Sequence, residues 1–422
     1  MDFNAALDVI EGVEGGGADL GGFEPPYPDF PVEEYRRRYA RVIALMEESG
    51  LDVLVLTQEE PVRYLSGYSS LIWATGQWLP TAFVVTRDPR DALLVHSVFD
   101  GGCARGTAWV PDLEPYPDAA EIAPKIVARI RRAAGDSARV GMETHAGSAV
   151  ALPWPVAQEI VQAGGPEIGD AAGILSAVRM IKSEREIARM RDLVAATAAG
   201  YSAGLAAARG GMTEKELVGR IGSEMLARGA TPGTRPVFLN CVSGPERYHL
   251  ADAQASDRAL RDGDIVFVDG GGGADGYMSD LIRLIAVGDI SAEAERHADA
   301  ALAATEAMVR AVKPGLRVSE LYEAGRASFR ESGVDEAAGA LFGHGIGTQL
   351  WERPLIQPHD DADEDVRLRE GMVICVEPIL APPGSDGALA GIFVFEEMVA
   401  VTAGGGDVLS SGLPRVLTRA PA

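Results

Sequence analysis

Short apolar runs and longer amphipathic stretches alternate along the first part of the chain. The runs L-D-V-L-V-L-T, T-A-F-V-V-T and D-A-L-L-V-H are bounded by turn residues and predict strands. Amphipathic stretches that begin near Val32 and end at Gly50, and that span about residues 119–134, predict helices. This alternation indicates a compact α/β domain over residues 31–178. Residues 1–30 are rich in glycine, proline and acidic groups, and they predict an arm outside any core.

The remaining part of the chain, residues 179–422, contains an internal repeat. The segments G-M-T-E-K-E-L from Gly211 and G-L-R-V-S-E-L from Gly315 share glycine, glutamate and leucine at equal offsets. Each segment follows an Ala-rich helical pattern and precedes strand-like runs. Ser183 and Glu186 form a capping box that predicts the start of the first Ala-rich helix. We therefore expect a duplicated α+β unit with a site between its halves.

Four acidic residues and one histidine in this second part predict a metal centre. Asp269 and Asp280 flank a glycine-rich turn whose Asp-Gly pair predicts a hairpin, which can bring both carboxylates to one end of a sheet. Glu377 and Glu396 lie in apolar runs, where a charge needs a partner, and His344 lies in G-H-G-I-G. Because buried carboxylates are costly unless they are compensated, this set predicts cations, with two ions expected. None of these donors is a thiolate, which favours Mn, Fe, Co or Zn over copper or an iron–sulfur cluster.

Each candidate taken singly has a simpler interpretation. Asp269 and Asp280 can be turn-flanking aspartates, and an isolated histidine such as His344 is usually structural. The glycines from Gly271 to Gly276 also fit G-x-G-x-x-G. A dinucleotide fingerprint must open a helix, whereas a strand-like run follows here, so this interpretation is rejected.

The ordered set resembles the pita-bread metallopeptidases, a family that includes methionine aminopeptidase, aminopeptidase P, prolidase and creatinase. The resemblance is carried by Asp269 and Asp280, followed by G-H-G-I-G, E-P and E-E-x-V-x-V. The earlier segments E-S-G-L-D-V-L-V-L-T and V-R-Y-L-S-G-Y are similar to the creatinase/prolidase N-terminal domain. The resemblance implies an α/β N-terminal domain followed by a duplicated α+β pita-bread catalytic domain.

The resemblance also implies roles for the five metal ligands. Asp269 would bind one ion, and Asp280 and Glu396 would bridge both ions. His344 and Glu377 would bind the second ion. Two ions would activate a water molecule as the nucleophile, and Glu377 would in addition carry a proton to the leaving nitrogen. Manganese is the expected metal, with iron, cobalt or zinc as alternatives.

Four further residues are candidates for substrate contacts. His249, in E-R-Y-H-L-A-D, matches the family's upstream active-site histidine and would donate a hydrogen bond to the substrate. Trp351 stands where the peptidases carry a second substrate-contacting histidine. Its indole cannot accept a proton, but it can stack on a proline ring or face a cationic substrate. Arg283 and Arg353 are candidate partners for a substrate carboxylate, with a structural role as the alternative.

Three functions follow from the resemblance. The first is a dinuclear metal-dependent hydrolase of small amide substrates, most simply an Xaa-Pro dipeptidase or aminopeptidase. The second, favoured by Trp351, is a non-peptidase member that acts on a small nitrogen- or sulfur-containing carboxylate, as creatinase and the dimethylsulfoniopropionate lyase do. The lyase carries an aspartate near the position of Gly271, and creatinase lacks metal ligands that this chain retains. The third is a non-catalytic binding module, which the complete ligand set disfavours.

Charge and composition limit the partners. The formal net charge of -24 argues against electrostatic binding to nucleic acid or to an anionic membrane surface. No apolar stretch approaches the roughly 20 residues of a membrane span, and no signal-peptide pattern is evident. Three scattered cysteines fit a reducing, cytoplasmic setting. The family resemblance implies a homodimer, in which segment 62–78 of the partner closes the pocket over a dipeptide or another small substrate.

Overall fold

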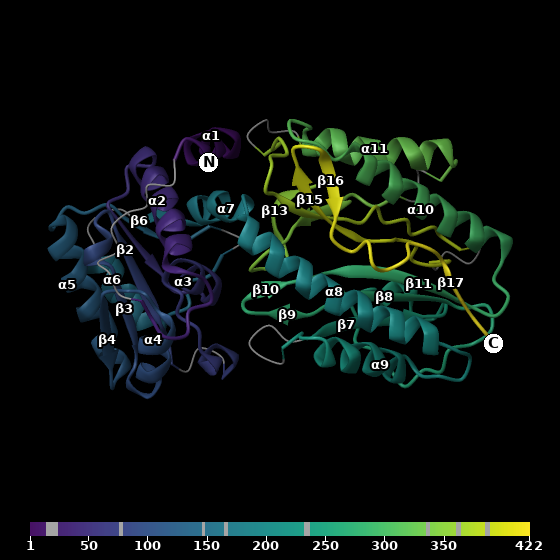
Figure 1. The fold of residues 1–422 in the computed structure, drawn as a ribbon, viewed down its shortest axis with the longest axis horizontal. Helices are drawn as coiled ribbons and strands as arrows, with labels where there is room; N and C mark the ends of the chain where they lie inside the picture. The colour runs from purple at the N-terminus through teal and green to yellow at the C-terminus, as the bar shows by residue number, and fades with distance from the viewer. Residues whose placement is uncertain are drawn as a thin grey trace. The chain divides into compact units, whose positions relative to one another are not determined.

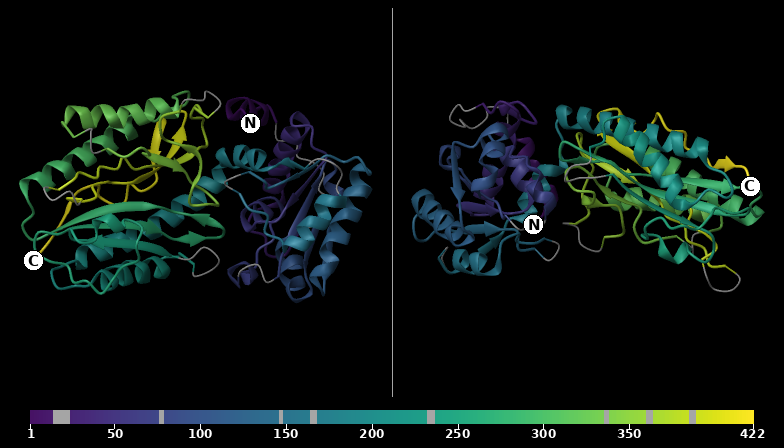
Figure 2. Two further views of the ribbon diagram at one scale, coloured as in Figure 1. Left: turned by 180° about the vertical axis from the view of Figure 1, so that it is seen from behind. Right: turned by 90° about the horizontal axis from the view of Figure 1, so that it is seen from below.

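The computed structural model describes most of the chain as two compact units. Their limits are Met1–Arg179 and Met180–Ala422, and Figures 1 and 2 colour the chain from purple at its N-terminus to yellow at its C-terminus. The described residues are 1–13, 24–75, 79–145, 148–163, 168–231, 237–334, 338–359, 364–384 and 389–422. Residues 76–78 of the segment expected to close a partner's pocket lie outside these ranges.

The first unit is built on a six-stranded mixed sheet in the order β4-β3-β2-β1-β5-β6. Its strands are β1 (Val53–Leu56), β2 (Ala82–Thr86), β3 (Leu93–Ser97), β4 (Asp112–Tyr116), β5 (Val140–Met142) and β6 (Ile168–Asp170). Its α-helices are α1 (Phe3–Glu11), α2 (Val32–Glu48), α3 (Glu59–Ser66), α4 (Gly101–Thr107), α5 (Ile122–Ala134), α6 (Trp154–Ala163) and α7 (Ala172–Met180). Strands β1, β2 and β3 are buried at every position. They are therefore covered on both faces, which explains their continuous apolar runs and confirms the predicted α/β domain.

Helix α1 corrects the expectation of an arm at the N-terminus. Asp2 caps the helix, because its side chain accepts a hydrogen bond from a backbone N–H of the first turn. Phe3, Leu7 and Ile10 are buried on one face, and the helix contacts α2. The prediction failed because it rested on the overall composition of residues 1–30, in which glycine and acidic residues dominate. The short amphipathic pattern of Phe3, Leu7 and Ile10 was not recognised. Residues 14–23 lie outside the described part of the chain.

The second unit contains two main sheets and a small hairpin. One sheet has the order β17-β11-β8-β7, and the other has the order β13-β12-β14-β15-β16. The strands of the first are β7 (Phe238–Ser243), β8 (Ile265–Gly271), β11 (Leu281–Val287) and β17 (Thr418–Ala420). Those of the second are β12 (Gly343–Gly345), β13 (Glu352–Leu355), β14 (Val373–Val376), β15 (Glu397–Thr402) and β16 (Gly405–Val408). The hairpin pairs β9 (Gly273–Ala274) with β10 (Tyr277–Met278).

The helices of this unit repeat with a fixed offset. Helix α9 (Glu214–Ala227) and helix α11 (Val318–Glu331) begin and end 104 residues apart, and α8 (Glu184–Ala207) and α10 (Ala292–Ala311) end at the same offset. Figure 1 shows α8 and α9 on one side of the strands and α10 and α11 on the other. The capping box predicted at the start of α8 is present. The duplicated unit inferred from the sequence is therefore visible in the arrangement of its helices.

Two hydroxyl groups at equivalent positions of the repeat reach the ends of strands. The Tyr201 hydroxyl, on α8, contacts the carbonyl oxygens of Gly270 and Leu281. The Thr305 hydroxyl, 104 residues later on α10, lies 2.8 Å from the carbonyl oxygen of Phe395. Each helix thus holds the backbone next to residues that were predicted to bind metal. Among the described residues, no helix combines the length and the apolar character needed to cross a membrane.

Candidate metal centre

The first sheet positions the two predicted aspartate ligands. Asp269 lies in β8 and pairs with Ile282 of β11, and Asp280 immediately precedes β11. Between them the β9–β10 hairpin turns at Asp275 and Gly276, both with positive φ, so the predicted Asp-Gly hairpin is confirmed. Because strand β11 rather than a helix follows the glycines, the rejection of a dinucleotide site is also confirmed.

The second sheet positions the three other predicted ligands. His344 lies in β12, Glu377 directly follows β14, and Glu396 directly precedes β15. A backbone hydrogen bond joins the two sheets at this place, from the Glu396 N–H to the carbonyl oxygen of Ile282. The strand ends that carry the ligands therefore face one another across the boundary between the sheets.

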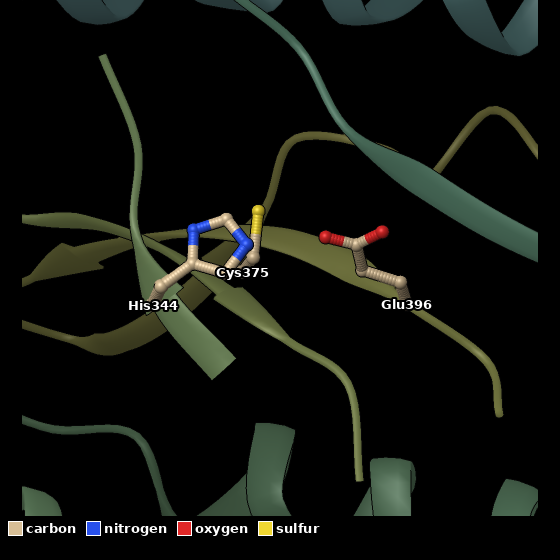
Figure 3. A group of neighbouring side chains, drawn as sticks. All are labelled: His344, Cys375 and Glu396. Atoms are coloured by element: carbon tan, nitrogen blue, oxygen red, sulfur yellow. The ribbon is translucent and has the colours of Figure 1, made fainter. Parts of the chain in front are cut away.

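Oxygen, nitrogen and sulfur donors converge in two overlapping groups. Asp269, Asp280 and Glu396 offer carboxylate oxygens that all lie within 4.8 Å of one another. A second group, drawn in Figure 3, contains His344, Cys375 and Glu396 within the same limit. Glu396 belongs to both groups. The structure thus brings together, from both sheets, residues that lie far apart in the sequence.

The hydrogen bonding of the buried carboxylates tests whether the site fits cations. Asp280 is 5% exposed and Glu396 is 0% exposed. Oδ1 of Asp280 and both side-chain oxygens of Glu396 have no hydrogen-bond partner within the described part of the chain. Burial raises the pKa of both carboxyl groups well above the usual range, and neighbouring carboxylates raise it further. Oxygens in this condition match the ligands that divalent cations take, so the donor set fits a metal centre.

Asp269 and Glu377 share this electrostatic environment. Burial raises the pKa of Asp269 to about 7. Burial and the nearby charge of Asp269 raise the pKa of Glu377 to about 8. Without cations, the site therefore holds protons that an ordinary carboxylate would have released at neutral pH.

The tautomer of His344 suits metal binding. Its Nδ1 lies 2.9 Å from the carbonyl oxygen of Gly345, which can only accept a hydrogen bond, so Nδ1 carries the proton. Its Nε2 is then a lone-pair donor and lies 3.4 Å from Oε1 of Glu377. Burial lowers the pKa of His344 to about 4, so the imidazole is neutral at physiological pH. A histidine fixed by a backbone carbonyl on one nitrogen and open on the other is a typical metal ligand.

Arg283 is not placed to bind a substrate, which corrects the expectation from the sequence. Its side chain is 0% exposed and pairs with Glu397 at 2.7 Å. Its other N–H groups donate to the backbone carbonyl oxygens of Ile282, Glu396, Leu413 and Pro414. All five guanidinium donors are thus used inside the protein. Arg283 therefore stabilises the backbone at Glu396. The sequence motif S-D-L-I-R is equally compatible with this structural role and with substrate binding.

Trp351 lies beside the predicted centre. Its indole stacks on the imidazole of His344, with ring centroids 5.0 Å apart. The preceding loop is held by Glu352, which accepts backbone hydrogen bonds from Thr348 and Gln349 and pairs with the buried Lys182 at 2.9 Å. The position of Trp351 is therefore fixed by the same strand that pairs with β12.

The two remaining candidates, His249 and Arg353, differ in their surroundings. His249 lies in the short 3-10 helix η5 (Tyr248–Leu250), with its side chain exposed. Arg353 lies in β13 and forms an ion pair with Glu364. Their roles toward a substrate stay predictions.

Cys375 was not among the residues predicted from the sequence. It lies on β14, two positions before Glu377, and its thiol is buried. Because side chains two positions apart on a strand share a face, the spacing C-V-E is the sequence signal that could have placed this thiol on the same face as Glu377.

Comparison with known proteins identifies the fold and the family. A model of the metallopeptidase family M24 matches residues 188–403, and a model of the creatinase/prolidase N-terminal domain matches residues 38–181. The chain belongs to metallopeptidase family M24. Membership of the M24 family confirms the expected pita-bread fold with its creatinase-type N-terminal domain. It also makes the chain a metal-dependent hydrolase that uses divalent ions.

Similar M24 proteins match along most of their length. The Xaa-Pro dipeptidase of Pyrococcus horikoshii is 26% identical over 345 residues, covering 80% of this chain and 88% of the relative. The probable dipeptidase PepE of Mycobacterium bovis is 29% identical, covering 89% of this chain and 94% of the relative. The crystal structure of dipeptidase PepE from Mycobacterium ulcerans matches with a TM-score of 0.78 and 25% identity, covering 93% of this chain and all of that one.

Proposed function

We propose that this chain is a dinuclear metal-dependent hydrolase of small amide substrates, acting as an Xaa-Pro dipeptidase. One observation carries the proposal: Glu396 is common to both donor groups, and neither of its buried oxygens has a partner within the described residues. A carboxylate in this position suits a ligand shared by two ions. The names of the M24 relatives, which include Xaa-Pro dipeptidases, supply the substrate class.

The five predicted ligands would hold two ions. Asp269, Asp280 and Glu396 would hold the first ion, and His344 and Glu377 would hold the second. Divalent ions in such a site polarise a substrate carbonyl and lower the pKa of water. The side chains lie in or directly beside five different strands, so few degrees of freedom have to be fixed when a substrate arrives.

Glu377 is the residue best suited to move a proton. A carboxylate at the rim of a metal centre can accept a proton from a water molecule and pass it on. Oε1 of Glu377 lies near Nε2 of His344, at the edge of the donor set. We assign Glu377 the transfer of a proton to the leaving nitrogen, and we assign His249 a hydrogen bond to the substrate.

The metal, the assembly and the compartment complete the proposal. On the oxygen and nitrogen donors alone, Mn²⁺ is the first candidate, followed by iron, cobalt and zinc. We propose a homodimer, which size-exclusion chromatography with light scattering would detect. The three free cysteines support a reducing compartment, the cytoplasm.

The second candidate is a non-peptidase that acts on a small onium or ureido acid. The exposed indole of Trp351 beside His344 favours it, since an aromatic face attracts cationic groups. Gly271 weighs against a lyase that needs an aspartate there. A Cβ at this position would lie 1.9 Å from the carbonyl oxygen of Ser279, so the backbone would have to shift to accept any side chain.

The test combines metal content with a substrate screen. The purified full chain is freed of metal, reloaded with Mn²⁺ or Co²⁺, and offered Xaa-Pro dipeptides together with small onium and ureido acids. We expect two ions per chain, cleavage of the dipeptides, and a loss of at least about 100-fold in kcat for Glu377→Gln. Glu306→Gln, an exposed change on α10, is the matched control and should leave activity unchanged.

Two results would overturn the proposal. If metal binds but only the small acids are cleaved, the second candidate replaces the first. If no metal binds under any loading condition, the chain is a binding module.

A further inference from the structure

We propose that Cys375 is a sixth donor of the metal centre and binds the ion that His344 holds. This inference rests on the proposed function only in requiring that the centre takes a divalent ion. It adds a thiolate to a donor set that the sequence predicted to contain oxygen and nitrogen alone.

Strand pairing places the thiol on the face of the sheet that carries the ligands. Cys375 of β14 is the direct partner of His344 in β12 on one side and of Met398 in β15 on the other. Directly paired residues of antiparallel strands point to the same face. Glu377 follows two positions later, so it also projects from this face. Cys375 therefore projects from the same face of the sheet as the predicted ligands His344 and Glu377.

The distances bring the sulfur within reach of an ion. A donor atom from each of Cys375, His344 and Glu396 lies within 4.8 Å of the other two. Figure 3 shows the sulfur beside the imidazole, with the carboxylate of Glu396 extending toward the same space. Zinc lies about 2.3 Å from a thiolate sulfur and about 2.0–2.2 Å from nitrogen or oxygen, so two donors of one ion lie at most about 4.5 Å apart, and this group is close to the spacing that one ion needs.

A second observation points to a ligand in the same space. Glu396 is 0% exposed, and both its carboxylate oxygens are without a hydrogen-bond partner in the described part of the chain. A buried carboxylate beside a neutral imidazole and a thiol has no compensating charge of its own. A cation between the three donors would supply that charge and use all three kinds of ligand.

Cys241 shows what a purely structural cysteine looks like in the same unit. It is also 0% exposed, but it lies on β7 in an apolar cluster that includes Leu217, Ile221 and Met225. Cys241 is in neither donor group. The two buried cysteines therefore differ in their surroundings rather than in their burial, which makes Cys241 the matched control.

A thiolate changes which ion the centre prefers. Sulfur ligands favour zinc and other borderline or soft ions, whereas manganese prefers carboxylates and water. The thiol gives up its proton when it binds the metal. The centre should therefore select Zn²⁺, Co²⁺ or Fe²⁺ over Mn²⁺, in contrast to the expectation drawn from the oxygen and nitrogen donors.

Absorption spectroscopy of the cobalt-loaded full chain tests the inference. Visible ligand-field bands report that Co²⁺ is bound, and a near-ultraviolet sulfur-to-cobalt charge-transfer band reports a thiolate ligand. We expect both signals in the unchanged chain and in Cys241→Ala. In Cys375→Ser and Cys375→Ala we expect the ligand-field bands to remain and the charge-transfer band to disappear.

The outcomes separate this inference from the proposed function. Ligand-field bands without charge transfer in the unchanged chain would overturn the role of Cys375 and leave the metal centre standing. A charge-transfer band that persists in Cys375→Ala would also overturn it. Failure of the chain to bind any Co²⁺ would overturn both the inference and the proposed function.

A competition experiment gives a second readout that does not depend on cobalt. The metal-free chain is equilibrated with equal Zn²⁺ and Mn²⁺, and the bound metals are measured by mass spectrometry. Loss even of an outer partner of a ligand costs about 10–100-fold in metal affinity, and a thiolate favours zinc over manganese, so Cys375→Ser should lower the zinc-to-manganese ratio by roughly tenfold or more. An unchanged ratio in Cys375→Ser would contradict the proposal, and Cys241→Ala should match the unchanged chain.

Discussion

The indole of Trp351 lies nearly flat on the imidazole of His344, with their planes inclined by only 20°. The indole is 56% exposed whereas His344 is 1% exposed, so Trp351 covers the outer face of a predicted metal ligand. Because Glu352 and Lys182 fix the adjoining backbone, the stack has little freedom to separate. Trp351 therefore links the orientation of a predicted ligand to the exposed surface beside it.

Trp351→Ala should loosen the metal centre without unfolding it. Aromatic stacking contributes about 0.5–1.5 kcal/mol, so the dissociation constant of the ion held by His344 should rise roughly 2- to 13-fold. Titration calorimetry with the metal-free chain measures this change. Trp351→Phe keeps a stacked ring and should retain most of the affinity; equal affinities in all three chains would contradict the coupling.

Removal of metal should lower the stability of the second unit. At a free metal concentration 100 times its dissociation constant, binding contributes about 2.7 kcal/mol per site. For a unit of this size, that corresponds to a fall in Tm of roughly 5–11 °C on treatment with a chelator. Scanning calorimetry before and after chelation, and after metal is added back, measures the shift. A Tm that is unchanged by the chelator would argue against an occupied metal centre.

The metal-free chain should become less stable as the pH rises. Burial raises the pKa of Asp269 to about 7 and that of Glu377 to about 8, above their usual values of 3.8 and 4.5. The folded state therefore binds more protons than the unfolded state between about pH 4 and 8. The stabilisation from these protons is complete below about pH 4 and is lost as the pH rises through 7 and 8.

Urea unfolding of the metal-free chain at about pH 6 and pH 8 checks this sign. Glu377 alone should account for a loss of about 2 kcal/mol over this interval. In Glu377→Gln the loss should shrink by that amount. The metal-loaded chain should show the reverse trend, because ions displace the protons and bind more tightly at higher pH. A metal-free chain that gains stability toward pH 8 would refute the assignment.

Arg283→Met should destabilise the protein strongly. The change removes the buried partner of Glu397 and leaves backbone carbonyl oxygens without donors, which costs about 3–5 kcal/mol. Arg353→Met, which breaks a partly exposed pair with Glu364, should cost less than about 1 kcal/mol. Equilibrium unfolding of both variants gives the comparison. If Arg283 bound substrate instead, its replacement by Lys would raise KM and leave stability unchanged.

The sequence allowed the fold and the convergence of the donors to be predicted because these depend on local patterns. Asp269 and Asp280 flank an Asp-Gly turn, and the hairpin geometry brings them to one end of the sheet. The repeat was visible in glycines such as Gly211 and Gly315, which adopt positive φ at equivalent turns before α9 and α11. A positive φ favours glycine at such positions, irrespective of contacts with the rest of the protein.

The errors concern residues whose role depends on distant neighbours. The segment S-D-L-I-R does not indicate what Arg283 contacts, because four of the five hydrogen bonds from its side chain go to residues 396–414. Cys375 was classed with scattered cysteines because its partner across the sheet, His344, is 31 residues away. The spacing C-V-E indicates that Cys375 shares a face with Glu377, but no local pattern reports the contact with His344, since that contact arises only when the second sheet forms.

Glu396 is both the residue shared by the two donor groups and the last of the predicted ligands along the chain. During synthesis the other ligands are made first, and the centre stays incomplete until β15 has joined its sheet. If these residues bind metal, the centre would therefore be completed only when most of the second unit has been made.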